Sequence, residues 1–98
     1  MKSSDNVNAT LTGRISVIVP AKNEADCLPA MLAELPRDLL HEIIVVDGNS
    51  IDGTRDVAEN LGYQVIEQEG DGYGMAVSTG LKHASGEFIT FIDADGSY

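Results

Sequence analysis

Basic residues are scarce in this chain, and their scarcity excludes one class of partner. The 98 residues include 16 aspartates and glutamates but only 6 lysines and arginines, which gives a net charge of −10. Binding to nucleic-acid phosphates needs a clustered positive surface. The basic residues are instead scattered along the sequence, as Lys2, Arg14, Lys22, Arg37, Arg55 and Lys82. We therefore expect no nucleic-acid partner.

Cysteine and long apolar runs are equally scarce. Cys27 is the single cysteine, so no internal disulfide can form, which fits a reducing compartment. No run approaches the roughly 20 apolar residues that span a bilayer. The first fourteen residues are polar and lack the apolar core of a signal peptide. These absences predict a cytoplasmic protein with a flexible tail over residues 1–14 and one domain over residues 15–98.

Three short apolar runs are present and predict buried strands. Runs that are rich in β-branched residues and lack a polar alternate face are typical of parallel strands covered on both faces. The runs are Ile15–Val19, Glu42–Asp47 and Phe88–Ile92, and a short, weaker strand is predicted over Gly62–Glu67.

Helical patterns separate these runs. Leu28, Met31, Leu32 and Leu35 follow one another at helical spacing, and Asp26 is the expected cap of that helix, with Pro29 in its first turn. Two more helices are predicted, over Asp52–Leu61 with Val57 and Leu61 facing inward, and over Met75–Ala84 with Val77, Leu81 and Ala84 facing inward. Gly80 inside the last helix predicts close packing or a nearby ligand, because glycine there costs about 1 kcal/mol relative to alanine.

The order β-α-β-α-β-α-β predicts an α/β fold with a Rossmann-like parallel sheet and helices on both faces. Pro20, Asp47 and Asp93 each follow a strand, so they are expected along one edge of the sheet, where open α/β sheets bind ligands. Neither the dinucleotide fingerprint nor a P-loop is present.

Two carboxylates end the last strand. Asp93 and Asp95 are two residues apart, and hard oxygen donors placed together suit Mg²⁺ or Mn²⁺, which can then hold a diphosphate. A short acidic turn that is merely solvated is the alternative, and from these two residues alone it is the commoner case. The residue alone likewise leaves two roles for Asp47: it binds a ligand, or it caps the turn that follows it.

Four segments together resemble a known family. VIVPAKNE (residues 17–24), EIIVVDGNSIDGT (42–54), GYGMAVSTGLKHASGE (72–87) and FIDADGSY (91–98) are similar, in order and spacing, to the nucleotide-binding half of family 2 glycosyltransferases of the GT-A fold. The polyprenyl-phosphate (dolichyl-phosphate) mannosyl- and glucosyltransferases look most alike. The resemblance implies an inverting transferase that uses a nucleotide-diphosphate sugar, UDP- or GDP-linked, with Mg²⁺ or Mn²⁺.

The resemblance also implies roles for single residues. Asp93 and Asp95 would hold the metal, with Ser97 as a further ligand. Asp47 would accept a hydrogen bond from the imide-type N–H of uracil or guanine, as an acceptor-only carboxylate can. The residues expected around the nucleotide sugar are Pro20, Ala21, Lys22, Glu24, Asp47, Gly72, Gly74, Asp93 and Ala94.

Three positions depart from the family pattern. Gly48 stands where many members have a second aspartate, Lys22 replaces a commoner aromatic residue, and Tyr73 stands where a basic residue is frequent. The sequence also stops three residues after Asp95, before the family's acceptor-binding half and its catalytic base. We therefore expect no catalytic residue in this chain and little or no transfer by it alone.

The expected acceptor is a polyprenyl phosphate at the cytoplasmic face of a membrane, or a sugar hydroxyl. The expected protein partner is either another copy of the chain or a missing C-terminal half. The sequence leaves two other functions. A non-catalytic nucleotide-binding or partner-dependent module is the main alternative, whereas a nucleotidyltransferase is disfavoured because PAKNE replaces the glycine-rich loop expected after the first strand.

Overall fold

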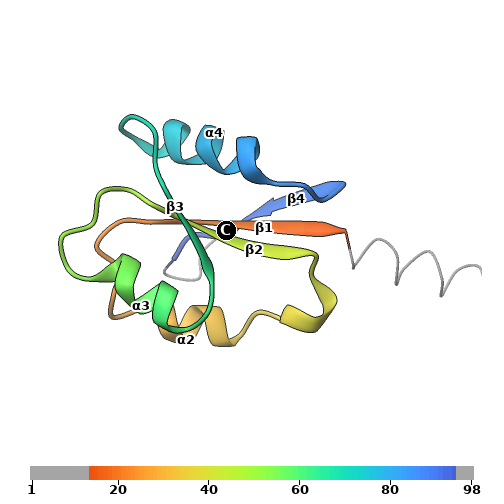
Figure 1. Cartoon of the computed structure of the whole chain (residues 1–98), viewed down its shortest axis with the longest axis horizontal. Helices are drawn as coiled ribbons and strands as arrows, with labels where there is room; N and C mark the ends of the chain where they lie inside the picture. Colours follow the sequence, from red (N-terminus) through yellow and green to blue (C-terminus); the bar gives the residue numbers. More distant parts are fainter. Residues whose placement is uncertain (1–13, 95–98) are drawn as a thin grey trace, which may run out of the picture.

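The computed structural model describes residues 14–94 as a four-stranded parallel sheet with helices on both faces (Figure 1). Its order across the sheet is β3-β2-β1-β4, and each neighbouring pair is parallel. The strands are β1 (Ile15–Ala21), β2 (Glu42–Asp47), β3 (Gln64–Glu67) and β4 (Phe88–Phe91). The predicted α/β architecture is confirmed, while residues 1–13 of the tail predicted over residues 1–14 lie outside the described residues.

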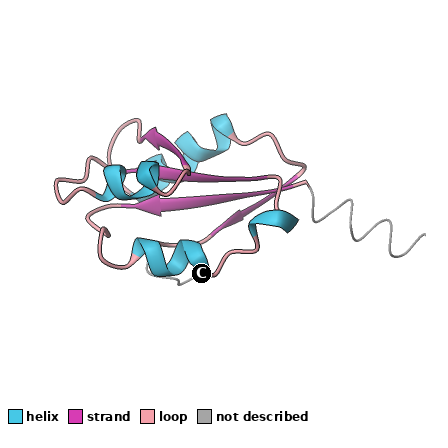
Figure 2. Cartoon of the chain, turned by 60° about the horizontal axis from the view of Figure 1, so that its bottom comes forward, coloured by secondary structure: helices cyan, strands magenta, loops and turns pink. Residues whose placement is uncertain are grey.

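The helices divide between the two faces. α2 (Leu28–Ala33) and α3 (Thr54–Asn60) lie on one face of the sheet, and α4 (Tyr73–His83) lies on the other (Figures 1 and 2). A short 3₁₀ helix that the sequence did not predict, η1 (Arg37–Leu39), precedes β2. No helix between residues 14 and 94 is long and apolar enough to cross a membrane.

Alternate residues of the central strands feed two apolar layers, as the period of two in a strand requires. The first layer lies under α2 and α3, and includes Val17, Val19, Ala21 and Val45 with Leu28 and Leu32. The second lies under α4, and includes Ile18, Ile44 and Val46 with Ala76. The central strands are therefore covered on both faces, as predicted.

Small residues form the buried face of α4. Ala76, Thr79 and Gly80 are buried, whereas Leu81 is exposed, so the inward face predicted for this helix was wrong at Leu81. The close packing predicted at Gly80 is confirmed. A Cβ at Gly80 would lie 2.5 Å from Cγ2 of Ile18, so only glycine allows the helix to approach β1 this closely.

Two helix ends also differ from the sequence prediction. α2 is capped by Cys27 and not by Asp26, and it makes no side-chain capping bond. Pro29 does lie in its first turn, as expected. α3 begins at Thr54, and Leu61 just beyond it is exposed rather than inward, because Ala58 and Thr54 make the buried face instead.

β4 is less buried than its apolar sequence predicted. It lies at one end of the strand order, and its residues alternate between exposed and half-buried. Ile89 and Phe91 pack against the layer under α4, while Phe88 on the other face is 47% exposed. The prediction of a fully buried strand was wrong because no helix among the described residues covers that face of β4.

A network of polar groups ties the amino ends of the strands together. The hydroxyl of Ser16 and the backbone N–H of Ser85 donate to the same oxygen of Glu42, at 2.7 and 2.6 Å. The N–H of Gly86 donates to the Ser16 hydroxyl at 2.8 Å. Partial burial acts to raise the pKa of Glu42, but the hydrogen bonds from Ser85 and Ser16 outweigh it, so the net shift is downward.

Candidate functional site

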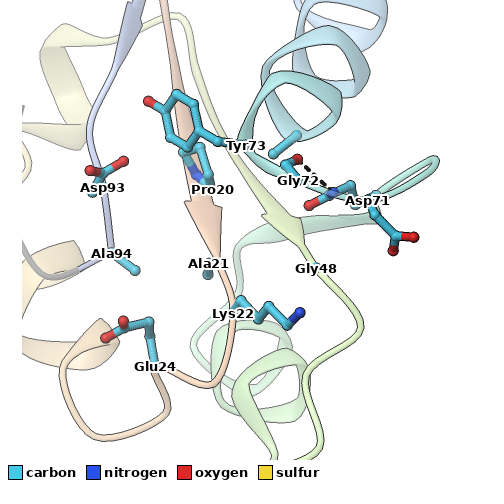
Figure 3. A pocket seen from close by; sticks show the side chains of 12 residues that line it. Pro20, Ala21, Lys22, Glu24, Gly48, Asp71, Gly72, Tyr73, Asp93 and Ala94 are labelled. Atoms are coloured by element: carbon cyan, nitrogen blue, oxygen red, sulfur yellow. Dashed lines mark hydrogen bonds between the residues drawn. The ribbon is translucent and has the colours of Figure 1, made fainter.

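A cavity of about 320 Å³ opens at the carboxyl ends of the strands (Figure 3). We call it the carboxyl-edge cavity. It gathers loops that are far apart in sequence, as the topology predicts for this edge. Its walls are Pro20, Ala21, Lys22, Glu24, Gly48, Gln68, Asp71, Gly72, Tyr73, Ala76, Asp93 and Ala94.

Most residues expected around the nucleotide sugar meet in this cavity. Those present are Pro20, Ala21, Lys22, Glu24, Gly72, Asp93 and Ala94. Two expected residues are not among its walls, Asp47 and Gly74. Asp95 and Ser97, expected to bind metal with Asp93, lie outside the described residues. The ligand roles of all these residues stay predictions.

Asp47 lies on the other side of the sheet edge. It follows Val45 by two residues in β2, and Val45 packs in the layer under α2 and α3. Asp47 is 4% exposed and accepts a long 3.4 Å bond from the N–H of Ser50. Its other oxygen, Oδ1, is buried without a hydrogen-bond partner among the described residues. It borders a second cavity, of about 410 Å³, beside Ser50 and Glu67.

The residues that follow β2 and β3 lie on the face of the sheet opposite to the last residue of each strand. Gly48 and Gln68 come directly after β2 and β3, and both line the carboxyl-edge cavity. The backbone ladder runs on past the strands and fixes them there: Gly48 N–H donates to the carbonyl of Ala21, and Gln68 N–H donates to that of Asp47, both at 2.8 Å. Strand periodicity thus places Gly48, and not Asp47, in the cavity.

The two loops that follow β1 and β2 are bound to each other by side chains. The N–H of Asn23 donates to Ser50 Oγ at 2.8 Å, and Asn23 Oδ1 accepts from the N–H of Ile51 at 2.9 Å. Asn23 adopts a φ of 54°, a left-handed conformation that asparagine tolerates better than most residues. This pair of bonds holds the loop that carries Lys22 and Glu24.

A second pair of bonds anchors the same loop to the start of α3. Thr54, which is fully buried, accepts from the N–H of Glu24 at 2.9 Å. Its own hydroxyl donates to Asp52, and that bond is the largest cause lowering the pKa of Asp52. Asp52 also accepts from the N–H of Ala25 at 3.1 Å. The segments AKNE and GNSIDGT therefore form one hydrogen-bonded unit.

Tyr73 and Asp93 face each other across the cavity. Figure 3 shows the Tyr73 ring near Pro20, with its hydroxyl toward Asp93. Burial, the charge of Asp93 and a hydrogen bond to Asp93 raise the pKa of the Tyr73 hydroxyl. The hydroxyl is therefore protonated at neutral pH and serves as a neutral hydrogen-bonding group, not as a substitute cation.

The charged residues that line the cavity are mostly acidic, which favours a bound cation. Three carboxylates, those of Glu24, Asp71 and Asp93, face a single ammonium group, Lys22. A diphosphate entering this cavity would be repelled unless a cation came with it. The hard oxygens of Asp93 suit Mg²⁺ or Mn²⁺. Among residues 14–94 no three histidine, cysteine, aspartate or glutamate side chains gather as a metal site, so Asp93 alone does not make one.

Sequence reasoning missed several walls of the cavity. Parity along β2 could have indicated Gly48, because Val46 faces α4 and residue 48 follows it on that face. Ala76 could have been found from its helical spacing to Thr79 and Gly80. Gln68 could have been indicated in the same way as Gly48, because Ile66 of β3 faces α4 and residue 68 follows it on that face. Asp71 carried no such signal, since the loop after β3 has no regular period.

A sequence profile of Glycosyl transferase family 2 matches residues 16–98. The chain belongs to glycosyltransferase family 2. The match covers the cavity residues from Pro20 to Ala94, and the recognition of the family from the four sequence segments is thereby confirmed.

Curated relatives of this glycosyltransferase sequence are longer. An uncharacterized glycosyltransferase of Mycobacterium tuberculosis is 42% identical over 83 residues, which cover 85% of this chain and 37% of the relative. A dolichyl-phosphate hexose transferase of Haloferax volcanii is 33% identical over 86 residues, covering 86% of this chain and 37% of that protein. The chain thus spans about a third of the length of these relatives.

Solved glycosyltransferases share the fold. The glucosyl-3-phosphoglycerate synthase of Mycobacterium tuberculosis in complex with UDP superposes with a TM-score of 0.82 at 31% identity, over 93% of this chain and 37% of that one. The same enzyme has been solved with Mn²⁺, UDP-glucose and phosphoglyceric acid, with a TM-score of 0.81 at 31% identity, over 92% and 36%. Mannosyl-3-phosphoglycerate synthase from Rubrobacter xylanophilus gives 0.81 at 27% identity, over 96% and 33%.

Proposed function

We propose that this chain is the donor half of an inverting family 2 glycosyltransferase, and that the carboxyl-edge cavity binds a nucleotide-diphosphate sugar. The observation that carries the proposal is the convergence of Pro20, Lys22, Glu24, Gly72 and Asp93 on one cavity. UDP is the favoured nucleotide, because a solved relative that is 31% identical is a complex with UDP. GDP is the other nucleotide to test.

We assign the binding roles from the walls of the cavity. Pro20, Ala21 and Lys22 line the nucleoside part, and Glu24, held by Thr54, accepts from ribose hydroxyls. Gly72 caps α4 and Gly74 lies in its first turn, where we place the diphosphate, and Ala94 is a further wall of the cavity. Asp47 remains a candidate for reading the base.

Asp93 and Asp95 would hold Mg²⁺ or Mn²⁺, with Ser97 as a further ligand. Such a metal, when bound, supplies Lewis-acid stabilisation to the departing diphosphate. The residues of this chain position the donor: Tyr73 orients Asp93 through their hydrogen bond, and the linked loops hold Glu24. A solved relative with Mn²⁺ and UDP-glucose supports this cofactor assignment.

We propose a polyprenyl phosphate or a sugar hydroxyl as the acceptor. The named activity of the Haloferax volcanii relative, a dolichyl-phosphate hexose transferase, supports the first of these. A phosphate acceptor is already ionised at neutral pH, so it needs no general base to attack. A non-catalytic binding module is not favoured, because the relatives are named as glycosyltransferases.

Calorimetric titration tests the donor site. We expect the purified chain to bind UDP in the presence of Mn²⁺, and Asp93→Asn to weaken that binding at least about tenfold by removing a metal-ligand charge. Asp95→Asn should do the same. Asp38→Asn in η1, away from the cavity, is the matched control and should bind like the wild type. Failure of the folded wild type to bind UDP or GDP with Mn²⁺ would refute the proposal.

A further inference from the structure

The side chain of Gln68 makes hydrogen bonds that neither the sequence motifs nor the family assignment explains. Its side chain lies in the carboxyl-edge cavity, directly after β3. The side-chain nitrogen Nε2 donates to two backbone carbonyls, to Gly70 at 3.1 Å and to Gly72 at 2.9 Å, and Figure 3 draws the second bond as a dashed line. Both N–H groups of this amide are therefore used within the loop.

These two bonds determine which way the amide faces. A glutamine side chain has one donor end and one acceptor end, and its orientation follows from its partners. Because two carbonyl oxygens surround the nitrogen end, the oxygen Oε1 must face the other way. It accepts no hydrogen bond from the described part of the chain, so its acceptor capacity is open.

Gly48 leaves room for this oxygen. A Cβ at Gly48 would lie 3.0 Å from Oε1 of Gln68 and 3.4 Å from Cβ of Lys22. Both neighbours line the same cavity. The amide oxygen therefore lies beside the space that a side chain at position 48 would fill, and glycine leaves that space open.

We infer that Gln68 determines nucleotide specificity by accepting a hydrogen bond from the imide N–H of the base, and this inference rests on the proposed function. Uracil carries a donor N3–H between two carbonyl oxygens, and the ammonium group of Lys22 can donate to one of those oxygens. Cytosine presents an acceptor at N3, which would face the acceptor of Gln68. Two acceptors that face each other without a donor cost affinity, so the cavity selects uracil over cytosine.

Asp47 is the rival for this role, and the geometry favours Gln68. Asp47 is not a wall of the carboxyl-edge cavity, whereas Gln68 is. Gln68 is neutral, so it reads a donor without adding to the three carboxylates that already surround the cavity.

The test compares UDP with CDP by calorimetry in Mn²⁺, for wild type, Gln68→Leu, Asp47→Asn and Gln64→Leu. Gln64 is an exposed glutamine at the start of the same strand and is the matched control. We expect the wild type and Gln64→Leu to bind UDP about tenfold more tightly than CDP. Gln68→Leu should bring this ratio close to one, while Asp47→Asn should leave it intact.

The ratio separates base reading from a purely structural role. Loss of the loop bonds to Gly70 and Gly72 would weaken UDP and CDP alike, so an equal loss in Gln68→Leu would overturn the inference. A ratio that falls in Asp47→Asn, or a wild type without preference for UDP, would overturn it too. A folded wild type that binds neither nucleotide, nor GDP, would refute the proposed function itself.

Discussion

Gly80 of α4 and Ile18 of β1 are in contact with no space between them for a further methyl group: a Cβ at position 80 would lie 2.5 Å from Cγ2 and 2.9 Å from Cδ1 of the isoleucine. This contact sets the distance between α4 and the sheet. Because α4 begins at Tyr73, it also sets the height of one wall of the carboxyl-edge cavity.

Alanine at position 80 should therefore destabilise the protein. We expect Gly80→Ala to lower the free energy of unfolding by about 1–3 kcal/mol through overpacking, despite the better helix propensity of alanine. Gly74→Ala in the same helix is the control, since nothing lies within 4 Å of a Cβ there, and it should raise stability by up to about 1 kcal/mol. Urea denaturation distinguishes the two, and equal stabilisation by both variants would contradict the contact.

Thr54 should matter to both stability and nucleotide binding. Thr54→Val keeps the shape but leaves the N–H of Glu24 without its partner, and we expect a loss of about 1–3 kcal/mol in unfolding free energy. UDP binding should weaken as well, because Glu24 lines the cavity. Thr90→Val, at an exposed position of β4, should change neither the unfolding free energy nor UDP affinity by a measurable amount. Unchanged UDP affinity in a folded Thr54→Val protein would show that the loop anchor is not needed for binding.

Glu42 should make stability depend on pH in the acid range. Its pKa in the folded protein lies below the ordinary value of 4.5, so folding favours the carboxylate. The stabilisation is then complete above pH 4.5 and is lost as the pH falls through the folded pKa. We expect the difference in unfolding free energy between wild type and Glu42→Gln to be largest near pH 7 and to shrink below pH 4.5. A difference that stays constant down to pH 3 would rule this out.

The chain by itself should bind the donor without transferring sugar. It spans about a third of the length of its curated relatives, and all the roles that we propose for its residues concern the donor. We expect no release of UDP above the uncatalysed rate when UDP-glucose, Mn²⁺ and a polyprenyl phosphate are mixed with the purified chain. Sugar transfer by this chain, detected as glycosylated lipid, would mean that an acceptor site and its catalytic groups lie within these residues.

The sheet could be predicted because its signal is local. Glu42–Asp47 is an uninterrupted run of β-branched residues between acidic ends, and the observed β2 has the same bounds. Helix boundaries depended on longer-range bonds. α3 starts at Thr54 rather than Asp52 because Thr54 bonds both Asp52 and the distant Glu24, a partner that no local pattern reveals.

Strand order alone predicted the edge of the sheet at which the site lies, but not the face. Knowing that Pro20, Asp47 and Asp93 end strands brought them to one edge, but not to one face. Asp47 lies on the face opposite Gly48, and the alternation along β2 would have shown this. Alternation along β3 would have placed Gln68 on the face of α4, but the direction of its amide could not be predicted, since it depends on the carbonyl groups of Gly70 and Gly72.

The polar network of Ser16, Glu42, Ser85 and Gly86 stands at the amino ends of the strands, whereas Gln68 and Lys22 stand at the carboxyl ends, roughly 16 Å away along strands that rise about 3.3 Å per residue. At the amino ends, Ser16, Glu42, Ser85 and Gly86 are hydrogen-bonded to one another. At the other end, the Gln68 oxygen and Asp47 Oδ1 accept no hydrogen bond from residues 14–94. A lineage could therefore change its substrate by replacing residues at one end of the sheet, while the groups at the opposite end continue to hold the fold together.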